Sequence, residues 1–141
     1  MKRFSVFAVL VLAAIFFVSM ASADSGGSGN YFVGLWEGVD PNDGSRRSVS
    51  ISDNDRDGVF DVYQYDTFWT LCGDDKGVTA GSAAVGAGGV LHFEGTLTCL
   101  STGTTVPFAV DYEAFRFSDT LVEVPLGVPL APATLHRTSS R

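Results

Sequence analysis

The chain has 141 residues and a formal net charge of −7, from 16 acidic and nine basic side chains. A chain this acidic repels nucleic acids and anionic lipid surfaces, so we expect neither as a partner. Its length suits one domain with a hydrophobic core.

The N-terminus has the pattern of a secretory signal peptide. Lys2 and Arg3 precede an apolar run over 4–18, and the small residues 21–23 (Ala-Ser-Ala) follow it. The run is shorter than the roughly 20 residues of a membrane-spanning helix. We therefore expect a signal peptide over 1–23, a flexible leader over 24–30, a folded domain over 31–138 and a tail over 139–141. The expected location is secreted or periplasmic, with no membrane insertion after cleavage.

From residue 31 onward the hydrophobic pattern has a period of two, and the segments are separated by turns rich in Gly, Asp, Asn and Ser. The expected strands and short apolar segments are 31–39, 46–52, 59–66, 67–72, 78–85, 90–100, 104–115, 121–125 and 133–137. Short connections favour antiparallel neighbours in chain order. The pattern predicts an all-β domain, a single meander barrel of seven to eight antiparallel strands, with a two-sheet β-sandwich as the alternative.

Two cysteines, Cys72 and Cys99, predict one disulfide in an exported chain. If 87–89 is a hairpin tip, counting outward along both strands places Gly77 opposite Cys99. Cys72 then lies across a short turn, within reach of the bond.

Gly34-Leu35-Trp36 in the first strand and Arg137 in the last resemble the signature of the calycin group, which includes lipocalins and streptavidin-like barrels. Asp111-Tyr112 resembles a second lipocalin motif. The resemblance implies a small exported bacterial barrel in which Trp36 plugs one end and Arg137 packs over it. A guanidinium over an indole face contributes about 0.5–2 kcal/mol.

The segment 53–61 begins like a calcium-binding loop. Asp53, Asp55 and Asp57 alternate before a glycine, Val59 offers a carbonyl, and Asp61 follows. The bidentate glutamate of an EF-hand is replaced by glutamine, and both flanks have a strand pattern. Two interpretations stay open, a weak calcium site or a plain hairpin turn in which Gly58 takes a positive φ. No other cofactor is expected.

Small residues over 80–84 leave space inside a barrel, which predicts an apolar pocket lined by five aromatic residues, Phe60, Phe68, Trp69, Phe93 and Phe108. The alternative is that these residues form the ordinary core. We expect a non-enzymatic barrel that binds a small apolar ligand or another exported component. The second hypothesis is a calcium-stabilised structural module. The third is a hydrolase-type enzyme using His92 or strand glutamates, and we assign no catalytic residue.

Overall fold

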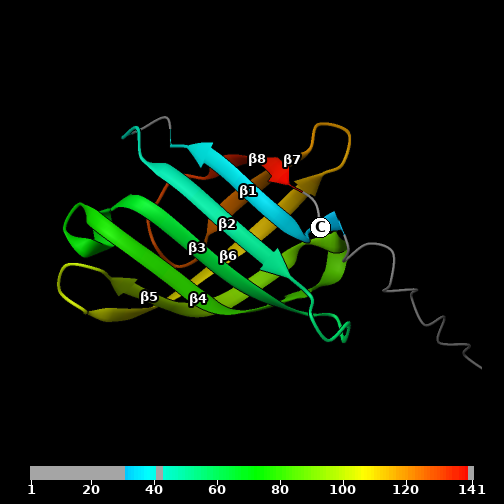
Figure 1. The fold of residues 1–141 in the computed structure, drawn as a ribbon, viewed down its shortest axis with the longest axis horizontal. Helices are drawn as coiled ribbons and strands as arrows, with labels where there is room; N and C mark the ends of the chain where they lie inside the picture. Colours follow the sequence, from blue (N-terminus) through cyan, green and yellow to red (C-terminus); the bar gives the residue numbers. More distant parts are fainter. Residues whose placement is uncertain (1–30, 41–42, 140–141) are drawn as a thin grey trace, which may run out of the picture.

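The computed structural model describes residues 31–40 and 43–139. These residues form an all-β fold in which each strand pairs with its neighbour in the chain, and the last strand pairs with the first to close a barrel. Figure 1 shows the strands wrapping around one interior. The strands are β1 (Gly34–Val39), β2 (Arg46–Ser52), β3 (Val59–Trp69), β4 (Asp75–Val85), β5 (Leu91–Cys99), β6 (Thr105–Phe115), β7 (Thr120–Pro125) and β8 (Ala133–Ser139).

The closed barrel confirms the predicted fold class, and the sandwich alternative is wrong. β3 is longer than expected, because the segment after Asp66 continues as strand to Trp69 across a shift in register. Such a bulge changes which side chains point inward. β8 extends to Ser139, one residue past the expected end of the domain. The predicted signal peptide and leader lie outside the described residues. Among the described residues, no helix has the length and apolar character needed to cross a lipid bilayer.

The two ends of the barrel differ. The mouth is the end formed by the connections that follow β1, β3, β5 and β7, at the left of Figure 1. The base is the opposite end, where the chain enters at Tyr31 and β2 turns into β3. Val128 and Leu130, in the connection from β7 to β8, pack against the core.

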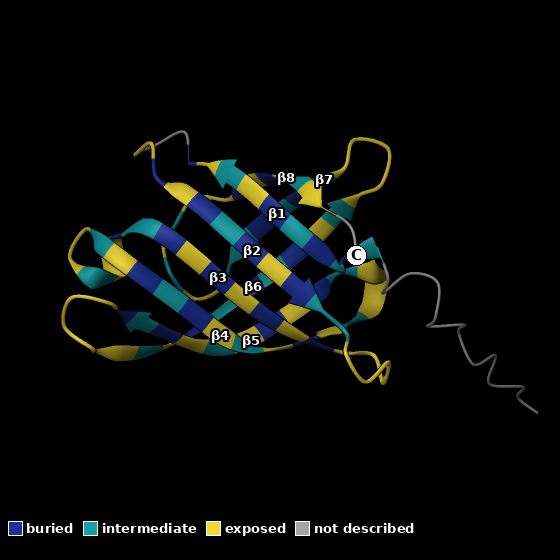
Figure 2. Ribbon diagram, in the orientation of Figure 1, coloured by how far each residue is buried: buried dark blue, intermediate teal, exposed yellow. Residues whose placement is uncertain are grey.

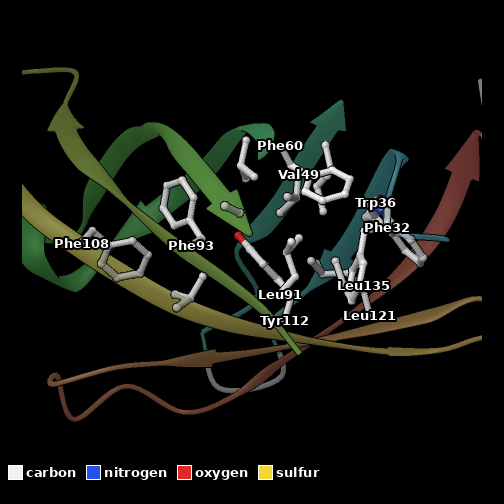
Figure 3. Close-up of a cluster of buried hydrophobic side chains, with 14 of the residues drawn as sticks. Phe32, Trp36, Val49, Phe60, Leu91, Phe93, Phe108, Tyr112, Leu121 and Leu135 are labelled. Carbon is white, nitrogen blue, oxygen red and sulfur yellow. Dashed lines mark hydrogen bonds between the residues drawn. The ribbon is translucent and has the colours of Figure 1, made fainter. Parts of the chain in front are cut away.

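Alternate residues of each strand point into the barrel, and Figure 2 shows this alternation as stripes of buried and exposed residues. The inward side chains are largely apolar and point toward one another in Figure 3. The buried apolar set comprises Phe32, Trp36, Val49, Ile51, Phe60, Val62, Trp69, Ala83, Leu91, Phe93, Leu97, Phe108, Val110, Tyr112, Leu121 and Leu135. These buried side chains come from all eight strands and from Phe32 before β1.

Trp36 lies at the base with no exposed surface, and its indole N–H donates to the carbonyl of Phe32 at 2.8 Å. The Arg137 guanidinium lies 4.1 Å from the centre of the Trp36 ring. Arg137 also donates to the carbonyls of Val33, at 2.6 Å, and Tyr31. One side chain of the last strand therefore holds both the first strand and the segment before it. His136, the preceding residue, is exposed, because Arg137 occupies the inward side.

Two facing glycines let β4 and β5 approach closely inside the barrel. Gly81 pairs with Gly95, and a Cβ atom on Gly81 would lie 2.2 Å from the carbonyl oxygen of Glu94. A Cβ atom on Gly95 would lie 2.5 Å from the ring of Phe93. The space predicted from the small residues of β4 is thus taken up by the neighbouring backbone and by Phe93.

Replacing Gly81 by alanine should destabilise the barrel by about 1–3 kcal/mol, because the obstruction is backbone and cannot rotate away. Urea denaturation followed by tryptophan fluorescence measures the change. Ser82→Ala is the control, since Ser82 is exposed on the outer wall and should change stability by less than about 0.5 kcal/mol. Equal stability of the Gly81→Ala variant and the wild type would contradict the packing described here.

Candidate functional site

Cys72 and Cys99 form a disulfide with a Cα–Cα distance of 5.3 Å, which confirms the predicted bridge. Gly77 pairs with Cys99, as the hairpin count predicts. The bond ties the short 3₁₀ turn after β3 (Thr70–Cys72) to the end of β5 at the mouth. A disulfide is compatible with a location outside the reducing cytoplasm.

The acidic segment connects β2 to β3 as a hairpin turn, and Gly58 has the expected positive φ of 82°. Asp57 accepts the backbone N–H of Val59 at 2.9 Å, and Asp61 accepts an amide N–H of Asn54 at 3.2 Å. Within residues 31–40 and 43–139, no three His, Cys, Asp or Glu side chains come together as a metal site. Asp53 and Asp55 belong to the same turn. Calcium binding by this segment stays a prediction.

Four of the five residues predicted to line an apolar pocket are buried in the core: Phe60, Trp69, Phe93 and Phe108. Trp69 and Phe108 meet edge to face, with ring centres 5.0 Å apart. Phe68 follows the register shift in β3 and is half-buried. The four buried rings pack within the hydrophobic cluster, which is the alternative that the sequence left open. An apolar ligand among them stays a prediction.

The mouth half of the interior contains a buried polar cluster, defined by Arg47, Gln64, Asp66, Tyr112 and Glu123. Arg47 Nε donates to Asp66 Oδ2 at 2.8 Å, and its Nη1 donates to Glu123 Oε1 at 3.1 Å. Gln64 Nε2 reaches the same Glu123 oxygen at 3.4 Å. The Tyr112 hydroxyl donates to Gln64 Oε1 at 3.0 Å. Arg47 and Asp66 are cross-strand partners, whereas Glu123 belongs to β7, so the cluster crosses the interior.

Burial and neighbouring charge set the protonation of this cluster. Burial acts to lower the pKa of Arg47, but the carboxylates of Glu123, Asp66 and Asp40 raise it overall, so the guanidinium stays charged. Burial raises the pKa of Glu123, opposed in part by Arg47 and by the hydrogen bond from Gln64. Burial also raises the pKa of Tyr112 well above its ordinary value, so its hydroxyl stays a donor.

The alternation of inward and outward residues along β2 and β3 predicts that three polar side chains of this cluster point inward. Val49 and Ile51 point inward, so Arg47 must too, and Phe60 and Val62 likewise imply Gln64 and Asp66. The inward position of these polar side chains was not among the predictions from the sequence.

The residues considered for catalysis are on the outer wall, where Glu94 and Glu113 lie two residues along their strands from the paired His92 and Asp111. His92 Nδ1 lies 2.6 Å from Asp111 Oδ1 on the neighbouring strand, and His92 is half exposed. Glu37, Glu94 and Glu113 are exposed on three different strands. The contacts described for these residues do not bring His92 together with both a pair of carboxylates and a nucleophile.

The outer wall also has a distinctive surface, the neutral band, which crosses β2 to β6 as two adjacent rows of outward side chains. In strand order, the rows are Ser48, Tyr65, Val78, Thr98, Thr105 and Ser50, Tyr63, Ala80, Thr96, Pro107. None of these residues is charged or buried. Neighbouring strands lie about 4.8 Å apart, so the band is roughly 19 Å long.

The two tyrosines on β3 are the largest side chains of the band. Tyr63 is 58% exposed and Tyr65 is 37% exposed. They sit two residues apart on β3, so their Cα atoms are roughly 6.8 Å apart along the strand. Four of the outward residues just beyond the band are charged, Arg46 and Lys76 toward the mouth and Asp61 and Glu94 toward the base. β2, β3 and β4 face the viewer in Figures 1 and 2.

Comparison of the chain with protein-family models, with curated proteins and with solved structures finds no match. The closed antiparallel barrel is compatible with the calycin plan, and the resemblance to that group rests on the residues around Trp36 and Arg137.

Proposed function

We propose that the protein is an exported, non-enzymatic barrel that binds a neutral polysaccharide along the neutral band of its outer wall. The observation that carries the proposal is an uncharged surface across five strands of a chain with a net charge of −7. Charged side chains normally cover an acidic protein, so a continuous region without them favours an uncharged partner.

The chemistry of the neutral band favours a sugar polymer over an apolar partner. Seven of its ten residues carry a hydroxyl group. An apolar partner would bury these hydroxyls without hydrogen bonds, which is unfavourable. Sugar hydroxyls both donate and accept, as do those of serine, threonine and tyrosine. The exposed rings of Tyr63 and Tyr65 offer apolar faces for the C–H surfaces of sugar rings.

The shape of the surface also favours a linear polymer. The outer wall of a closed barrel is convex across its strands. Two rigid convex surfaces meet along a narrow strip, whereas a flexible chain can follow the curve across β2 to β6. The packed interior supports the same choice, because 16 apolar side chains are buried there.

Native electrophoresis in gels that contain hydroxyethylcellulose or a galactomannan tests this function. Both polymers are neutral, and at least one should retard the wild-type protein, while anionic alginate should not. Tyr63→Ala should raise the dissociation constant about tenfold or more, since 1.4 kcal/mol corresponds to a factor of ten. Tyr63→Phe should keep most of the retardation if ring stacking dominates.

The matched control is Val59→Ala. Val59 lies on the outward face of the same strand and is 50% exposed, but it lies outside the neutral band. This variant should migrate like the wild type in every gel. The proposal fails if neither neutral polymer retards the protein, or if Tyr63→Ala and Val59→Ala are retarded equally.

A further inference from the structure

Glu123, in the polar cluster, has a carboxylate oxygen without a partner. Its side chain has no exposed surface. Oε1 accepts hydrogen bonds from Arg47 and Gln64, whereas Oε2 is buried and has no hydrogen-bond partner among the described residues. A buried carboxylate oxygen without a donor is strongly unfavourable. The geometry therefore calls for a donor at this point.

The charges around Arg47 do not balance. Its guanidinium lies between Asp66, at 2.7 Å, and Glu123, at 3.1 Å, and the carboxylate of Asp40 is 4.0 Å away. Asp66 and Glu123, two carboxylates without exposed surface, thus share this one cation. Asp66 takes the two shortest contacts and also accepts the backbone N–H of Phe68 at 3.1 Å. Glu123 therefore has the longer and weaker contact with the guanidinium.

Other buried polar groups beside the cluster suit a small polar ligand. Thr79 Oγ1 and Trp69 Nε1 are buried and also have no partner among the described residues. Thr79 pairs with Gln64 across β3 and β4. The Arg47 guanidinium lies 5.4 Å from the centre of the Trp69 ring, so aromatic surface borders the cluster. Because residues 31–40 and 43–139 contain no metal-ligating group of three side chains, a metal ion is disfavoured.

We propose that the mouth half of the interior binds a small primary ammonium ion, ammonium itself or a short alkylamine, which donates an N–H hydrogen bond to Glu123 Oε2. An ammonium group supplies the missing positive charge and the missing donor together. It needs fewer oxygen ligands than a metal ion. The site is distinct from the neutral band, because Glu123 points inward and the band points outward.

Entry to the site is from the mouth. The connection after β7 begins immediately beyond the strand that carries Glu123. Leu126 in this connection is 43% exposed, whereas Val128 and Leu130 pack on the core.

The test is a titration of protein carrying ¹³C-labelled glutamate side chains with methylammonium chloride at constant ionic strength. The Glu123 carboxyl resonance should shift saturably with methylammonium and with ammonium. Tetramethylammonium has no N–H donor, and sodium is a metal ion, so neither should reproduce the shift. This measurement uses the wild-type protein and does not depend on the folding of a variant.

A matched pair of variants gives a second readout. Glu123→Gln keeps the shape of the side chain and an oxygen that accepts from Arg47, but it removes the negative charge. It should raise the dissociation constant for methylammonium about tenfold or more. Glu113→Gln changes an exposed glutamate of β6 and should leave binding unchanged. Absence of a saturable Glu123 shift overturns the proposal, as does the same shift with sodium or tetramethylammonium. Equal binding by the two variants also overturns it.

Discussion

Alanine in place of Arg47 should lower the free energy of unfolding by about 3–5 kcal/mol, because it leaves two buried carboxylates without their cation. Asp66 and Glu123 have no exposed surface, and both have ion-pair contacts with the guanidinium. Urea denaturation followed by tryptophan fluorescence gives this change as a lower midpoint at an unchanged slope.

Arg46 is the control for this experiment. It is the preceding residue on β2 but points outward and is exposed, so Arg46→Ala should change stability by less than about 0.5 kcal/mol. Arg47→Lys should lie between the two, since an ammonium group cannot make the paired contacts of a guanidinium. A loss below 1 kcal/mol for Arg47→Ala would contradict the described cluster.

Removing the disulfide with the double variant Cys72→Ala/Cys99→Ala should destabilise the protein by about 3.6 kcal/mol, from the loss of loop-closure entropy in the unfolded chain. The two cysteines are 27 positions apart in the sequence. Chemical denaturation of the double variant, beside the wild type with and without reductant, measures the effect. The reduced wild type should match the double variant. Equal stability of oxidised and reduced wild type would contradict a stabilising role for the bond.

The fold could be predicted because its main signal is local. A period of two marks each strand, and turn residues mark the connections, so β2 has the expected bounds. The pairing of Gly77 with Cys99 followed from counting out from one hairpin. The bulge after Asp66 was not predicted, because it depends on how Trp69 packs against Phe108 from another hairpin.

The candidate sites depend on pairings between distant segments. Local alternation could have placed Arg47 and Asp66 on the inside, yet it could not show that Glu123 meets them from β7. The neutral band is similar, because its charge-free character exists only once the register of β2 to β6 is known. In the sequence, Asp61 and Glu94 lie as near to the tyrosines and threonines of the band as the other band residues do. The sequence alone therefore does not separate the charged positions from the uncharged band.

The contacts that cross and close the barrel have a consequence for the order in which the chain can fold. Arg47 and Glu123 are 76 positions apart, and Trp36 pairs with Arg137 only when β8 arrives beside β1. Hairpins between neighbouring strands can form early. The ion pair between Arg47 and Glu123 forms late, because the entropy cost of closing the long loop between them must be overcome first. A chain that emerges N-terminus first therefore stays open until β8 has appeared, and it remains incompletely folded for most of its synthesis.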